Sequence, residues 1–289
     1  MEPRLSVSQI TTFRSTFAED VRRYAAAGLD GIGIWELKLP DGGDAEALEA
    51  LEASGLERAS AIPGTPSIGP LPRFGGLEDP AARVEAYCGS LERLAPFAPG
   101  AVVLLTGTGD RETIVDGLRT IAAEAERLGL TIALEPYQRD DAEDWSIVSS
   151  IPEALELIAD AGDPPNVGLQ FDAWHLWNGE TLLDDIAAHA VRFAGVHVSD
   201  KREPTRTWVD RALPGEGGAD IPAILRALDA AGWDGLYDIE IFSDDGTFGS
   251  ELEGSYWAAP PEETLARAVA AFERCWAMAC TPQEVEETR

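Results

Sequence analysis

Residues 167–200 read VGLQFDAWHLWNGETLLDDIAAHAVRFAGVHVSD. Two short apolar runs, Val167–Asp172 and Phe193–Asp200, have the length and boundaries of strands, and the amphipathic stretch Thr181–His189 between them predicts a helix. A connection of this length between two strands is typical of the crossover in a parallel βαβ unit. The segment therefore predicts a parallel sheet that is covered by helices.

The same alternation of strand and helix covers almost the whole chain. The other predicted strands are Leu5–Ile10, Gly31–Trp35, Arg58–Ile62, Ala101–Gly107, Thr131–Pro136 and Gly235–Phe242. The other predicted helices are Phe17–Ala27, Ala45–Ala53, Pro80–Leu94, Thr113–Leu128, Ile151–Ala161, Ile221–Ala231 and Pro261–Ala279. Eight strands that alternate with eight helices predict a single-domain α/β protein, a (β/α)₈ TIM barrel over residues 1–280, followed by a polar tail over residues 281–289. An open, doubly wound sheet is the alternative, but neither a G-x-G-x-x-G motif nor a P-loop follows the first strand.

The composition limits the partners and the compartment. The 289 residues include 52 Asp and Glu against 22 Lys and Arg, which gives a formal net charge of −30. The electric field of this negative charge repels nucleic acids and anionic membranes, so we expect neither as a partner. Three widely spaced cysteines indicate reduced thiols, and we find no apolar run of membrane-spanning length and no signal peptide at the N-terminus. We therefore expect a globular, cytoplasmic protein.

Polar side chains stand at the ends of four successive predicted strands. They are Glu135, Asp172, His197 and Glu240. In a TIM barrel these ends meet at one face, where active sites lie. Any one of these residues alone is more often a helix cap or a solvated group, but four at equivalent positions predict a metal site. Three carboxylates and one imidazole suit Mn²⁺, Mg²⁺ or Co²⁺ better than a structural zinc ion.

At these positions the chain resembles the xylose-isomerase-like TIM barrels, the sugar phosphate isomerase/epimerase superfamily. The resemblance covers most of the chain and is strongest in Ala133–Pro136, Phe171–Trp177, Gly195–Asp200, Asp210–Gly217 and Tyr237–Phe242. It implies that the four strand-end residues are the metal ligands, with Mn²⁺ as the first choice. It also implies that Glu135 and Glu240 are catalytic, because the two equivalent Glu residues of the ketose 3-epimerases move protons on opposite faces of the substrate.

The resemblance further implies substrate-binding residues. His175 stands three residues after the metal-binding Asp, as the family's substrate-binding His does. Arg211 lies in the segment DRALPGEG (Asp210–Gly217), which is similar to the family's D-R-G-x-x-G-x-G-like loop. Asp141 stands where the epimerases have a substrate-binding Glu, and its side chain is one methylene shorter.

Aromatic residues gather near the proposed mouth of the barrel. They are Trp35, Tyr137, Trp174, Trp177, Trp208 and Trp257. We expect a pocket that stacks on sugar faces or on an aromatic group, with Trp35 and Trp174 in contact with the substrate. The segment Lys201–Val209 forms an insertion relative to the epimerases, and Phe242–Trp257 is a long loop after the last strand. Both fall where substrate identity is set.

Two more polar residues share a strand face with a proposed metal ligand. Because side chains alternate along a strand, Gln170 points to the same side as Asp172, and Asp238 to the same side as Glu240. We expect Gln170 and Asp238 to lie behind the ligands and orient them. For Asp238, an ion pair with a cation on a neighbouring strand is the equal alternative.

These residues predict a divalent-metal-dependent isomerase or epimerase of a small sugar or polyol. Glu135 or Glu240 would remove a proton next to a carbonyl, and the metal would stabilise the enediolate. The alternative is a lyase with the same first step. It would be an inosose dehydratase, or the catalytic subunit of a C-glycoside deglycosidase that eliminates an aglycone from a 3-keto C-glycoside and works with a small second subunit.

Two further functional classes share this fold. DNA-repair endonucleases of this fold bind three zinc ions through many His ligands, and 3 His residues with a net charge of −30 exclude that function. A non-catalytic sugar-binding barrel is the third alternative. The apolar C-terminal helix, which contains Phe272, Trp276 and Met278, is compatible with a homo-oligomer and equally with core packing.

Overall fold

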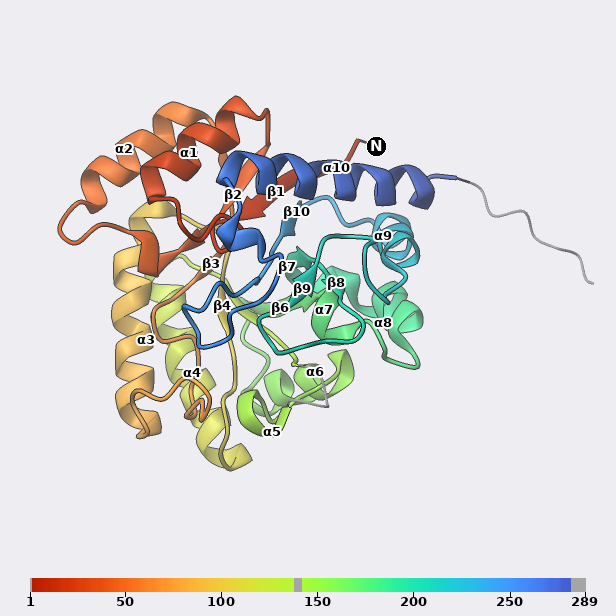
Figure 1. Cartoon of the computed structure of the whole chain (residues 1–289). Coiled ribbons are helices and arrows are strands. Elements are labelled where there is room, and N and C mark those ends of the chain that lie inside the picture. The colour runs from red at the N-terminus through yellow and green to blue at the C-terminus, as the bar shows by residue number, and fades with distance from the viewer. Residues whose placement is uncertain (1, 138–141, 282–289) are drawn as a thin grey trace, which may run out of the picture.

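Eight parallel strands form a closed barrel. The computed structural model describes residues 2–137 and 142–281. The barrel strands are β1 (Arg4–Ser8), β2 (Gly31–Trp35), β3 (Glu57–Ile62), β4 (Ala101–Leu104), β5 (Ile132–Leu134), β6 (Val167–Asp172), β7 (Phe193–Val198) and β10 (Leu236–Ile239). They are hydrogen-bonded in the order β1-β10-β7-β6-β5-β4-β3-β2, which closes the ring (Figure 1). This closure confirms the TIM barrel that the sequence predicts.

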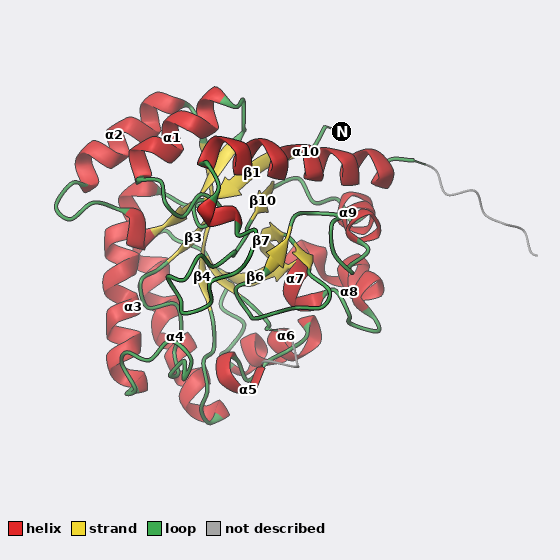
Figure 2. Ribbon diagram, viewed as in Figure 1, coloured by secondary structure: helices red, strands yellow, loops and turns green. Residues whose placement is uncertain are grey.

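Helices surround the barrel on its outside, as Figure 2 shows in red around the yellow strands. The long helices are α1 (Phe17–Ala26), α2 (Asp44–Ser54), α3 (Pro80–Leu94), α4 (Arg111–Leu128), α6 (Ile151–Asp160), α8 (Leu182–His189), α9 (Ile221–Ala230) and α10 (Pro261–Ala279). Their ends follow local sequence signals: α1 begins with a capping box between Thr16 and Glu19, and α4 ends at Gly129 in the left-handed conformation. Within the residues described, no helix is both long and apolar enough to span a membrane.

Two short helices near the barrel mouth are absent from the sequence prediction. They are α5 (Ala142–Trp145) and α7 (Ala173–Leu176). Four residues are too few to show a helical period, so no pattern could indicate them. The N-cap of α7 is Asp172, whose carboxylate accepts a hydrogen bond from the Trp174 N–H at 2.8 Å.

The prediction of one strand over Phe193–Asp200 was wrong at its end. The barrel strand β7 stops at Val198, and the chain then forms a small antiparallel sheet from β8 (Asp200–Lys201) and β9 (Arg211–Ala212). The Asp200 carboxylate is the physical reason. It accepts hydrogen bonds from the backbone N–H groups of Lys201, Gly215, Gly217 and Ala219 at 2.7–3.0 Å, which fold the chain back on itself.

Polar side chains occupy the inside of the barrel because two strand positions are glycine. A Cβ at Gly195 would overlap Gln170 Oε1 and Ser60 Oγ, and a Cβ at Gly33 would overlap Asp238 Oδ2. The side chains of Gln170 and Asp238 therefore point inward, as strand alternation predicts. The glycines leave the space that these two side chains fill.

We expect Gly195→Ala to lower the free energy of unfolding by about 1–3 kcal/mol, because the added methyl group overpacks the barrel interior. Gly89→Ala is the matched control. Gly89 is exposed in α3, and no described atom lies within 4 Å of the position that an alanine methyl group would take, so alanine there raises stability by about 0.5–1 kcal/mol. Urea unfolding of both variants measures the difference, and equal stabilities would contradict the overpacking.

Candidate functional site

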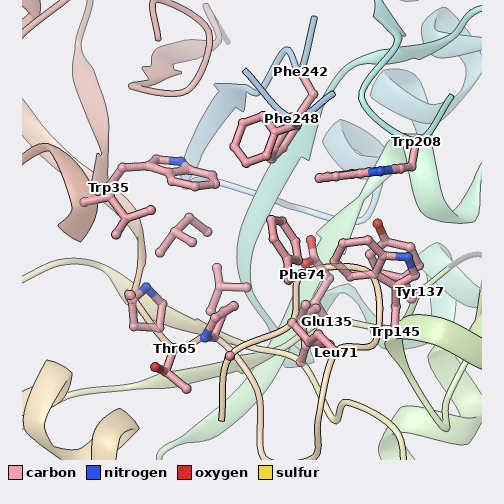
Figure 3. A pocket seen from close by; sticks show the side chains of 18 of the residues that line it. Trp35, Thr65, Leu71, Phe74, Glu135, Tyr137, Trp145, Trp208, Phe242 and Phe248 are labelled. Carbon is pink, nitrogen blue, oxygen red and sulfur yellow. The ribbon is translucent and has the colours of Figure 1, made fainter. Parts of the chain in front are cut away.

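A pocket of about 330 Å³ opens at the carboxyl ends of the barrel strands (Figure 3). Its wall includes Trp35 at the end of β2, Leu105 just after β4 and Tyr137 after β5. Its polar residues include Glu135, His175, Arg211 and Glu240. The pocket therefore lies at the face where TIM-barrel enzymes bind their substrates.

Three of the four predicted metal ligands form a compact group. Glu135, Asp172 and His197 each place one ligand atom within 4.8 Å of the others, and all three side chains are buried. His197 Nδ1 lies 3.7 Å from Glu135 Oε1 and 4.0 Å from Asp172 Oδ2. Strand register brings the last two together, because Asp172 and His197 are direct partners across β6 and β7.

Glu240, the fourth predicted ligand, follows β10 and reaches the same group. Its Oε2 lies 3.4 Å from His197 Nδ1, and its side chain is buried. The described part of the chain thus brings the three predicted carboxylates around Nδ1 of the fourth residue, His197.

The group has the unmet bonding capacity that a cation would satisfy. Glu135 Oε1 and His197 Nδ1 are buried and have no hydrogen-bond partner among the described residues. Buried polar atoms without a partner are rare in proteins. Oxygen and imidazole donors that face one point fit a divalent cation.

The electrostatics of the group reflect its burial. Burial raises the pKa of Glu135 to about 7. Burial alone would lower the pKa of His197, but the charges of Glu240, Asp238 and Glu135 raise it to about 10. A cation at this point would replace protons in neutralising the carboxylates.

Arg211 supplies positive charge to the same carboxylates. Its Nη1 donates hydrogen bonds to Asp172 Oδ2 at 2.8 Å and to Glu240 Oε2 at 3.0 Å. Burial raises the pKa of Asp172, but the charge of Arg211, the nearby His175 and His197 and the Trp174 N–H hydrogen bond together lower the pKa below its usual value. The guanidinium also stacks over Trp174 and Phe242, with its Cζ 4.9 Å and 4.8 Å from the ring centroids.

His175 lines the pocket beside Arg211 as a neutral ring. Burial lowers its pKa to about 3. Its Nε2 lies 3.7 Å from Asp172 Oδ2, its Nδ1 bonds to none of the described residues, and its ring centroid lies 3.7 Å from that of Tyr137. A neutral imidazole can either donate a hydrogen bond to a ligand oxygen or accept one from it.

The two polar residues inside the barrel differ in what they contact. Asp238 Oδ2 lies 3.8 Å from His197 Nε2, while Asp238 Oδ1 accepts a hydrogen bond from Ser6 Oγ at 2.9 Å. Gln170 Oε1 accepts a hydrogen bond from Ser60 Oγ at 2.9 Å. Asp238 thus faces the ring nitrogen of His197 that points away from the other carboxylates, whereas Gln170 is bonded to the opposite side of the barrel.

The predicted aromatic contacts divide into two groups. Trp35, Tyr137 and Trp208 line the pocket. Trp174 is fully buried and is not among the lining residues, and its ring packs against the Arg211 guanidinium. Its contact with the substrate stays a prediction. Trp177 and Trp257 also lie outside the lining. Asp141 lies outside the described residues.

Sequence reasoning missed several residues that line the pocket. They include Leu71, Phe74, Trp145 and Phe248. Phe74 stands in the segment LPRFGGLEDP (71–80), where the two glycines indicate only a loop. Loop residues have no period from which to infer their direction, so the sequence offers no signal for them.

The sequence and the fold of this chain are similar to those of known proteins. The model of the xylose isomerase-like TIM barrel family matches residues 21–275. The crystal structure of protein SMc04130 from Sinorhizobium meliloti 1021 superposes with a TM-score of 0.81 at 26% identity, covering 94% of this chain and 98% of that one. The structure of IOLI protein with a bound zinc atom has a TM-score of 0.76 at 20% identity, covering 96% and 100%, which shows a shared fold.

Curated relatives match parts of the chain. Inosose dehydratase from Geobacillus thermodenitrificans (strain NG80-2) is 25% identical over 148 residues, 46% of this chain and 47% of that one. A 3-dehydroshikimate dehydratase from Pseudomonas aeruginosa is 27% identical over 252 residues, 79% of this chain and 36% of that one. The matches thus span about half or less of these relatives' lengths. The family model matches most of the length of this chain, and the chain therefore belongs to the xylose isomerase-like TIM barrel family.

Proposed function

We propose that this barrel is a divalent-metal-dependent isomerase or epimerase that acts on a small sugar or polyol. The observation that carries the proposal is the buried group of Glu135, Asp172, His197 and Glu240, with unpartnered donor atoms among the described residues at the floor of a pocket. Mn²⁺ is the proposed ion, with Mg²⁺ and Co²⁺ as alternatives, because most of the donors are carboxylate oxygens.

The positions of the two proposed catalytic carboxylates support a two-base reaction. Glu135 follows β5 and Glu240 follows β10, and in the barrel β6 and β7 lie between these strands. Both side chains line the pocket, so they approach a ligand from different directions. One can remove a proton next to a carbonyl, and the other can return a proton to the opposite face or to the adjacent carbon.

The remaining groups would bind and orient the substrate. A bound divalent ion would polarise the substrate carbonyl and so acidify the neighbouring C–H. His175 and Arg211 present their ring and guanidinium N–H groups to substrate oxygens, and Trp35 offers an aromatic face across the pocket. Asp141, the proposed partner of a further hydroxyl, stays a prediction.

A lyase with the same first step is the second candidate. The matching inosose and 3-dehydroshikimate enzymes are dehydratases, which by their names remove water. Solved structures of sugar 3-epimerases share the fold at under 25% identity, so they do not decide between the branches. The aromatic outer wall of the pocket also suits a bulky apolar leaving group such as an aglycone, and a small second subunit would accompany that activity.

We expect metal-dependent deuterium uptake next to the carbonyl of the correct substrate. Proton NMR in D₂O, with and without Mn²⁺, against ketoses, inososes and 3-keto-glycosides measures it. Glu135→Gln and Glu240→Gln should each slow the exchange by about 100-fold or more, because each removes a proton-transfer group. A product with the composition of the substrate identifies an isomerase or epimerase, and released water or aglycone identifies a lyase. Metal-loaded protein that exchanges no proton in any of these compounds would contradict the proposal.

We expect Asp172→Ala to lower the affinity for Mn²⁺ by more than about tenfold, because the variant loses one oxygen ligand. Asp184→Ala is the matched control, since Asp184 is exposed on α8 and lies outside the lining of this pocket. Calorimetric titration of each protein with MnCl₂ gives both affinities. The ligand assignment fails if the two variants bind Mn²⁺ equally well.

Asp238 and Gln170 are proposed to orient the ligands from behind. We expect Asp238→Asn to weaken Mn²⁺ binding by about 10–100-fold, because Asp238 faces the far nitrogen of His197. Gln170→Leu tests the second residue in the same titration. Unchanged Mn²⁺ affinity in either variant removes that residue from the metal site.

A further inference from the structure

The outer part of the pocket is a continuous aromatic wall built by four separate segments of the chain. We call the following five side chains the aromatic subsite: Phe74, Trp145, Trp208, Phe242 and Phe248. Phe74 comes from the segment between β3 and α3, Trp145 from α5, Trp208 from the segment between β8 and β9, and the last two from the segment after β10. Figure 3 shows these rings around one space, with Trp35 on the side opposite Trp208.

The rings of the subsite are in direct contact with one another. The Phe74 ring centroid lies 4.9 Å from that of Trp145 and 5.1 Å from that of Trp208, in edge-to-face arrangements. Trp208 lies 5.8 Å from Phe248 and 6.0 Å from Phe242. Such distances and angles are those that aromatic rings prefer among themselves. The subsite therefore already holds one phenyl ring, that of Phe74, against Trp145, Trp208 and Phe248.

The subsite is continuous with the polar floor of the pocket. The Tyr137 ring stacks on Trp145 with an interplanar angle of 8°, and it also lies against the His175 ring, at 3.7 Å between centroids. A ligand whose oxygens reach His175 and Glu135 therefore places its far end among the aromatic rings.

Most of the charged and polar side chains of the described pocket lining are concentrated at the floor. Glu135, His175, Arg211 and Glu240 lie there, while Arg83 gives its N–H groups to Ser67 and to the Leu77 carbonyl. Hydroxyl groups of a ligand lose their hydrogen bonds to water when they lie against these aromatic rings. The rings offer few replacement partners, so this desolvation costs binding free energy. An apolar ring has no such cost.

The opening of the pocket is apolar as well. Leu37, Phe74 and Leu77 line it and are 71%, 45% and 46% exposed, and they are three of the large hydrophobic side chains that the described chain exposes. Single exposed hydrophobic residues are ordinary, but several around one opening are typical of a ligand site.

We propose that the substrate has two parts: a carbonyl-bearing polyol or sugar that reaches the polar floor, and a flat apolar group, such as an aryl ring, that lies in the aromatic subsite. This inference rests on the proposed function for the first part and on the aromatic wall for the second. It narrows the proposed substrate class from free sugars to sugar or polyol derivatives that carry a flat apolar group such as an aryl ring.

Binding of two simple glycosides tests the subsite without turnover. We expect phenyl β-D-glucoside to bind the Mn²⁺-loaded protein at least about tenfold more tightly than methyl β-D-glucoside, because only the former buries a ring. Calorimetry gives the affinities, and saturation-transfer NMR should show stronger transfer to the phenyl protons than to the sugar protons.

The variants separate a binding role from a structural one. Trp208→Ala should remove the preference for the phenyl glucoside, and Trp208→Phe should keep most of it. Trp276→Ala is the matched control, since Trp276 is a half-buried tryptophan on α10 that packs against Tyr237 and Phe272. Circular dichroism and Mn²⁺ titration verify that each variant is folded and loaded.

Three results would overturn the proposal. The first is equal binding of the two glucosides, and the second is no detectable binding of either. The third is a phenyl preference that Trp208→Ala retains. Failure of the proposed function looks different, because it removes deuterium exchange and leaves the phenyl preference intact.

Discussion

The structure of this site depends on neutralising several carboxylates that are buried together. Asp172 and Glu240 lie within hydrogen-bond distance of the same Arg211 nitrogen, and Glu135 lies within 4 Å of His197 on the other side of the group. Carboxylates without a counter-charge in a protein interior protonate or destabilise the fold. The guanidinium of Arg211 is a positive charge that the chain itself supplies, and a divalent ion is another that suits this arrangement.

The segment that carries Arg211 is fixed by hydrogen bonds to the neighbouring carboxylate. Asp210, its neighbour, accepts hydrogen bonds from Arg202 at 2.7 Å and from Arg206 at 2.6 Å. Burial raises the pKa of Asp210, but the hydrogen bonds from Arg206 and the charges of Arg202 and Arg206 together lower the pKa below its usual value. The same segment carries Trp208 into the pocket lining. The strand-end residues Glu135 and Glu240 thus lie in the polar part of the pocket, while most of the aromatic side chains that line it come from the segments between the strands.

The barrel and the four side chains proposed as metal ligands could be predicted from local patterns in the chain. Apolar runs and amphipathic stretches alternate with a clear period, and each of Glu135, Asp172, His197 and Glu240 stands at the end of such a run. Parallel strands in a closed barrel end at one face, so a local pattern was enough to predict that these four side chains meet. The inward direction of Gln170 and Asp238 followed from the same alternation.

Contacts between distant segments determine how the charges of the polar floor are neutralised. They also determine which side chains cover the floor. Trp174 belongs to a predicted cluster, yet the fold buries it behind Arg211, and the strand predicted to reach Asp200 ends early because that carboxylate binds backbone groups far along the chain. Phe74 and Phe248 come from loops and Trp145 from the short helix α5, and their rings meet only in the folded chain. Strand and helix periods are local and can be read in the sequence, whereas the direction of a loop side chain is set by the neighbours that the whole fold brings to it.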